Sequence, residues 1–223
     1  DKKNSGYENN IFGAGASLSY EKFRDIYLSP GFSLTYDDLT TDSTASELLR
    51  KQSGSSTDLL FDYALSTDKR DRRFMPREGY LTSFYQQLPM YADQPHIKNS
   101  FSTNHYKEVS EDLIGALKFS ATAINGINDE DVRVSQRLTL SSRKLRGFES
   151  GKVGPKDGDD FIGGNYSTTL NLEANFPNFF PEKSNAEIGL FLDAGNIWGV
   201  DYSDTIDDSN KLRSTVGLNT SWL

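Results

Sequence analysis

The stretch NYSTTLNLEANF, residues 165–176, decides the fold class because its side chains alternate strictly in character. The even positions are mostly apolar, namely Tyr166, Thr168, Leu170, Leu172, Ala174 and Phe176. The odd positions are all polar, namely Asn165, Ser167, Thr169, Asn171, Glu173 and Asn175. A period of two residues predicts a β-strand with one apolar face and one polar face.

The same alternation recurs along the whole chain. It is clear at 12–20, 28–36, 59–65, 117–123, 187–195 and 212–222, and weaker at 79–89 and 98–108. With the first stretch, these segments predict about nine antiparallel strands. Each segment has roughly ten residues, which is the length that a tilted strand needs to cross a bilayer.

The links between these segments differ in length. Short polar links near 21–25, 68–78, 125–131 and 177–185 alternate with longer or more acidic links near 37–57, 89–97, 109–112, 141–163 and 199–210, although the 109–112 link is short. We therefore expect one edge of the sheet to carry most of the long loops. Within 37–57, Thr44 and Glu47 have capping-box spacing, which predicts a short helix in that loop.

Composition argues against several functions. A net charge of −8 over 223 residues argues against a nucleic-acid partner, and the lack of cysteine excludes disulfides and thiolate chemistry. No run of 18 apolar residues predicts a transmembrane helix. His96 and His105 lack further ligands at suitable spacing, and no nucleophile elbow is present. We therefore predict no catalytic residue, no metal, no cofactor and no enzymatic activity.

The alternation leaves two architectures open. One is a soluble antiparallel sandwich or barrel, whose polar face meets water. The other is a transmembrane barrel with lipid outside and water inside. The polar faces are rich in Gly, Ser, Thr and Asn, which favours the transmembrane barrel. Aromatic residues near segment ends also favour it, namely Tyr20, Tyr36, Phe176, Trp198 and Trp222.

The loop stretch KLRGFESGK, residues 144–152, contains an arginine that could serve the polar face. Glu173 and Asp193 both fall on that face, where a carboxylate is partly removed from water. The planar fork of Arg146 is the best partner for such a group, because it can bind both oxygens. The pattern thus allows the loop to fold inward and hold a carboxylate.

The residues after Arg146 suit such a fold. Gly147 permits a sharp backbone turn, and Phe148 could pack on an inward residue such as Phe191. The alternative is that Arg146 belongs to a solvated run of charged neighbours, and the residues alone leave both interpretations open.

Three motifs carry a resemblance to a known family. LRGF (145–148), GGNYSTTLNLEANFP (163–177) and GLFLDAGNIW (189–198) resemble the C-terminal barrel of the BamA family. RRFMPREGYLTSF (72–84) is similar to that family's Pro–Gly turn. The resemblance covers essentially the whole chain. It implies an all-β, up-and-down transmembrane barrel of about 16 strands in the bacterial outer membrane. It also implies an insertase that folds and inserts other β-barrel proteins.

The resemblance assigns roles to individual residues. Arg146, Gly147 and Phe148 would form a latch in the barrel lumen, and the inner-wall partners would be Asp193, Glu173, Phe191 and Gly195. Asp193 is the surer partner, because a symmetric hairpin about 177–185 would place the two acids about four residues, or roughly 13 Å, out of register.

The resemblance also implies an organisation and a set of partners. Residues 1–223 would be a partial barrel domain, without the first strands, the last two strands and the periplasmic POTRA domains. The implied partners are unfolded outer-membrane proteins, outer-membrane lipid, and chaperones and Bam-type lipoproteins that bind through POTRA domains. A TamA-like assembly factor or a two-partner secretion transporter is the alternative within the superfamily. A passive or soluble β-barrel binding protein is the alternative outside it.

Overall fold

The computed structural model describes residues 2–4, 6–43, 45–128, 130–181, 186–201, 204–206 and 208–222. Within these residues one antiparallel sheet contains 11 strands, of which β1 (Lys2–Asn4) and β3 (Tyr20–Phe23) are short. The remaining nine are β2 (Tyr7–Ser17), β4 (Ile26–Thr41), β5 (Gly54–Asp68), β6 (Gly79–Ala92), β7 (His96–Ser110), β8 (Leu113–Gly126), β11 (Tyr166–Phe176), β12 (Ala186–Trp198) and β13 (Arg213–Trp222). The predicted set of about nine long strands is confirmed.

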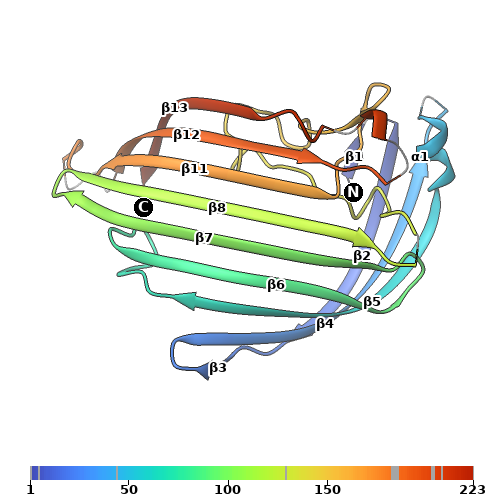
Figure 1. Cartoon of the computed structure of the whole chain (residues 1–223), viewed down its shortest axis with the longest axis horizontal. Coiled ribbons are helices and arrows are strands. Elements are labelled where there is room, and N and C mark those ends of the chain that lie inside the picture. The colour runs from blue at the N-terminus through green and yellow to red at the C-terminus, as the bar shows by residue number, and fades with distance from the viewer. Residues whose placement is uncertain are drawn as a thin grey trace.

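The strands follow one another in an up-and-down order. The order in the sheet is β1-β2-β4-β5-β6-β7-β8-β11-β12-β13, with β3 paired to β4, and Figure 1 shows the strands side by side in one curved sheet. Two short strands, β9 (Lys156–Asp157) and β10 (Asp160–Phe161), pair with each other inside the link between β8 and β11. In the part of the chain described above, no helix is long and apolar enough to span a membrane.

Apolar and polar side chains are distributed over the two faces of the sheet in the opposite way to that of a water-soluble protein. Leu192 on β12 keeps 45% of its surface exposed, while the next residue, Asp193, has a fully buried side chain. On β11, Leu172 is likewise exposed, while Thr169 and Asn171 are buried. Apolar side chains facing outward and polar ones facing inward characterise a barrel in lipid. The outer face of this sheet therefore meets hydrocarbon.

The two ends of the sheet carry different links. Figure 1 shows α1 (Glu47–Lys51) and the longest links at one end of the sheet. Two links lie at the other end from the one predicted: 109–112, short as expected, belongs with the short turns, and 125–131 opens the long link to β11. The longer link expected at 89–97 is reduced to 93–95, because β6 runs to Ala92 and β7 begins at His96. Successive antiparallel strands reverse direction, so consecutive links must lie at opposite ends of the sheet.

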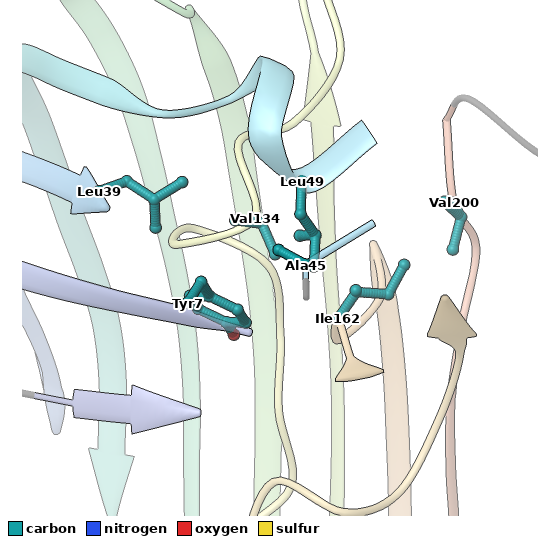
Figure 2. Packing of buried hydrophobic residues seen from close by; sticks show 7 residues of the cluster. All are labelled: Tyr7, Leu39, Ala45, Leu49, Val134, Ile162 and Val200. Atoms are coloured by element: carbon teal, nitrogen blue, oxygen red, sulfur yellow. The ribbon is translucent and has the colours of Figure 1, made fainter. Parts of the chain in front are cut away.

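The predicted short helix is present as α1. Its first turn is capped by Ser46, whose hydroxyl accepts a hydrogen bond from the Leu49 amide at 3.2 Å. Thr44, which the sequence offered as the cap, lies outside the described residues. The helix contributes Leu49 to a buried apolar cluster at the loop end of the sheet (Figure 2). Its members are Tyr7, Leu39, Ala45, Leu49, Val134, Ile162 and Val200.

Candidate functional site

The link between β8 and β11, residues 127–165 and hereafter the long loop, folds back onto the inner wall of the sheet. There the guanidinium of Arg146 donates two hydrogen bonds to the carboxylate of Asp193 on β12, from Nε to Oδ2 at 2.8 Å and from Nη2 to Oδ1 at 2.6 Å. The backbone amide of Arg146 donates to the same Oδ2 at 3.0 Å. Two parallel hydrogen bonds from the guanidinium and one from the backbone amide compensate the loss of hydration of the Asp193 carboxylate, which has no access to water.

Glu173 on β11 is the second acid at this arginine. Nη1 of Arg146 lies 2.9 Å from Oε1 of Glu173, and Nζ of Lys118 on β8 lies 2.7 Å from Oε2. Burial by itself would lower the pKa of Arg146, but the hydrogen bond to Asp193 and the charge of Glu173 raise it. The arginine therefore stays charged and joins two neighbouring strands.

The strand register explains how one arginine contacts both acids. Glu173 pairs with Phe191 and Asn171 pairs with Asp193, so the acids are two residues out of register rather than the four predicted. The hairpin centre lies one residue later than a symmetric turn over 177–185 would place it. Because pairing is antiparallel, a one-residue shift of the centre moves every partner by two residues.

Phe191 and Phe148 differ from their expected arrangement. The guanidinium of Arg146 stacks over the ring of Phe191, with Cζ of Arg146 3.8 Å from the ring centroid, which is a cation–π contact. Phe148 packs elsewhere, against a cluster of Leu140, Leu145, Val153 and Ile197. Gly147 lies between the two loop residues with φ of +85°, a left-handed turn that sends their side chains in different directions.

The two glycines of the predicted site lie at close contacts, Gly147 between the loop and β13 and Gly195 within the wall on β12. A Cβ on Gly147 would lie 3.0 Å from Oγ1 of Thr215 on β13, which pairs with Asp193. Gly195 is buried on β12, where a Cβ would lie 2.8 Å from the carbonyl oxygen of Thr168. The structure thus brings the loop residues Arg146 and Gly147 against β11, β12 and β13 together.

Other residues of the site were not predicted as members. Asn171 donates from Nδ2 to the carbonyl oxygen of Lys144 at 2.9 Å, which holds the loop backbone beside Arg146. Lys118 shares Glu173, and Gly217 on β13 lies opposite Phe191. All three wall residues fall on the polar face of their segments, so the alternation was the signal that could have found them.

Gly217 gives a direct test of the packing under the latch. A Cβ at this position would lie 2.7 Å from Cζ of Phe191, whereas a Cβ on Gly115 of β8 would have its nearest neighbours at 3.8 Å. We expect Gly217→Ala to lower the free energy of unfolding by about 1–3 kcal/mol, because the ring and the arginine on it must shift. Urea unfolding in detergent micelles measures this, with Gly115→Ala as the matched strand control. Equal midpoints for the two variants would contradict the packing described.

Residues 1–223 match the Omp85 superfamily domain over the whole chain. The chain belongs to the Omp85 superfamily. This confirms the resemblance inferred from the LRGF and GLFLDAGNIW motifs. The fold agrees as well: a BamA structure from Haemophilus ducreyi, lacking POTRA domains 1-3, superposes with a TM-score of 0.83 at 20% identity. The superposition covers 97% of this chain and 48% of that one.

Two relatives illustrate the breadth of the Omp85 similarity. The outer membrane protein assembly factor BamA of Neorickettsia risticii is 28% identical over 228 residues, covering 100% of this chain and 31% of that protein. The sorting and assembly machinery component 50 homolog of Homo sapiens is 28% identical over 170 residues, covering 72% and 36%. The chain thus spans about a third of the length of the curated relatives it matches.

Proposed function

We propose that this Omp85 chain is the barrel domain of an assembly factor that folds β-barrel proteins and inserts them into the bacterial outer membrane. The relative that matches over the full chain is named an outer membrane protein assembly factor, and a second is named a component of a sorting and assembly machinery. The chain lies in the bacterial outer membrane, as its bacterial relative and its barrel fold indicate.

The observation that carries the proposal is the inward loop held by Arg146. A passive pore needs an open lumen, whereas here a buried ion pair keeps a long loop against β11 and β12. Such a contact stabilises a wall whose neighbouring segments must move to admit a new strand. Assembly of this kind requires binding of the substrate and perturbation of the membrane, so no covalent bond is made or broken and no cofactor is needed.

The proposed partners follow from this function. Unfolded outer-membrane proteins are the substrates, and outer-membrane lipid surrounds the apolar face that Leu172 and Leu192 display. Binding of periplasmic chaperones and Bam-type lipoproteins through POTRA domains stays a prediction of the resemblance.

Reconstitution tests the function. The complete protein that contains this chain is placed in phospholipid vesicles, and a urea-unfolded outer-membrane barrel protein is added. We expect folded substrate, followed by its heat-modifiable mobility on gels, to appear faster than with vesicles that contain a passive porin. The same rate in both preparations would refute the assembly function. Export of a soluble substrate instead would indicate a secretion transporter, and recovery without detergent would indicate a soluble barrel.

A further inference from the structure

A second buried arginine, Arg133, lies near the start of the long loop. Its Nε donates to Oδ2 of Asp37 on β4 at 3.1 Å, and the two side chains are only 7% and 2% exposed. Its Nη2 donates to the carbonyl oxygen of Gly54 at the start of β5, and the hydroxyl of Ser135 donates to Asp37. Removal of either partner would leave the other charge buried and unpaired, which is strongly destabilising.

This pair is on a different wall from the Arg146 site. Asp37 and Gly54 belong to β4 and β5, while the Arg146 partners belong to β11 and β12. In the sheet order, β6, β7 and β8 separate these two pairs of strands. A single loop is therefore attached to two distant walls, each time by an arginine and an aspartate.

The backbone beside Arg133 is held as well. The amide of Val134 donates to Oε1 of Gln52 at 2.7 Å, and the amide of Val132 donates to Oδ2 of Asp201 at 2.7 Å. The side chain of Val134 belongs to the apolar cluster of Figure 2. The start of the loop thus has ionic, backbone and apolar attachments.

The Arg146 end is attached differently. The Arg146 side chain is 21% exposed and lines a cavity of about 410 Å³ together with Lys118, Glu173 and Glu187. Water can thus reach one latch and is kept from the other. Of the two ends, the Arg146 end is the one placed to open.

We propose that Arg133 and Asp37 form a second latch that fixes the start of the loop to the β4–β5 wall and thereby positions Arg146 on the opposite wall. The reason is effective concentration: a short tether keeps Arg146 near Asp193, and a free start would let the loop explore a larger volume. Arg133 is then a positioning residue for the Arg146 latch.

Disulfide trapping measures how often the Arg146 end is closed. This chain contains no cysteine, and a Cβ on Gly147 would lie 3.7 Å from the Cβ of Thr215, close to the mean of about 3.8 Å in disulfides. G147C/T215C in the membrane-inserted, complete protein should therefore cross-link under mild oxidation. The strain that a side chain introduces at the φ of +85° of Gly147 is common to every variant compared. G147C/T220C should not, because Thr220 lies on the outer face of β13.

Adding R133Q or D37N to this pair should slow cross-linking by about twofold, which corresponds to about 0.4 kcal/mol, because the free tether to Arg146 then begins at the end of β8 instead of at Arg133. The matched control is R143Q, the same substitution at an exposed arginine of the same loop, which should leave the rate unchanged. The charge exchange R133D/D37R should restore much of the rate, because it rebuilds an ion pair at the same place.

Two results would overturn the proposal. One is an unchanged cross-linking rate in both R133Q and D37N. The other is a slower rate that the charge exchange fails to rescue while heat-modifiable folding falls in parallel, which would make Arg133 a general stability residue. D37N keeps the shape of the wall, so it gives an answer even where R133Q does not fold.

Discussion

Replacing Arg146 by alanine should lower the free energy of unfolding of the barrel by about 3–5 kcal/mol, the cost typical of removing one partner from a buried ion pair. The loss falls mainly on Asp193, whose carboxylate has no access to water and takes two hydrogen bonds from the Arg146 guanidinium. The third, from the backbone amide of residue 146, remains in the alanine variant. Glu173 keeps Lys118 as a partner and suffers less. The measurement is the urea concentration at which the heat-modifiable form disappears, together with the assembly rate in vesicles.

Lys144→Ala is the matched control for this prediction. Lys144 is exposed two residues before Arg146, and its side chain makes one long contact, 3.4 Å from Nζ to the hydroxyl of Ser120. Loss of that contact should change stability by less than about 0.5 kcal/mol. If Arg146→Ala and Lys144→Ala had the same negligible effect, the latch would contribute nothing to the barrel.

Replacing Leu192 by arginine should destabilise the membrane-inserted barrel by about 2–4 kcal/mol, the cost measured for a cation near the bilayer midplane. Leu192 lies near the middle of β12 and is flanked by Leu172 on β11 and Val216 on β13, so the new charge would be surrounded by apolar side chains and hydrocarbon. Unfolding titrations in lipid vesicles measure the difference.

Leu212→Arg is the matched control, because Leu212 lies in the link before β13 and is 72% exposed. We expect little effect there, since the link lies outside the strands. A soluble barrel predicts the opposite pattern of results: two exposed leucines in water should both tolerate arginine. Similar, small effects at both positions would therefore contradict the transmembrane orientation of the outer face.

The sequence predicted the fold well because each strand residue faces either lipid or the lumen, and that environment alone determines whether its side chain is apolar or polar. Alternation along a segment such as 165–176 reports directly which side chains face outward, and strand length reports the bilayer thickness. The number of long strands and the polar faces that hold Glu173 and Asp193 followed from this local pattern.

What the sequence could not supply depends on geometry between segments. The register of β11 and β12 differed because a one-residue shift of the hairpin centre moves every partner by two. The Arg133–Asp37 pair was missed because it joins residues 96 positions apart, and because the acidic stretch after Tyr36 was assigned to a loop although β4 continues to Thr41. Phe148 was misplaced because a left-handed Gly147 reverses the local direction of the chain.

The partners of the two latches lie on opposite sides of the long loop in the sequence. Arg133 pairs with Asp37, 96 residues earlier, and Arg146 pairs with Asp193, 47 residues later. The loop therefore acts as a cross-brace between strands that precede it and strands that follow it. The β4–β5 and β11–β12 walls cannot move apart without breaking one of the two arginine pairs.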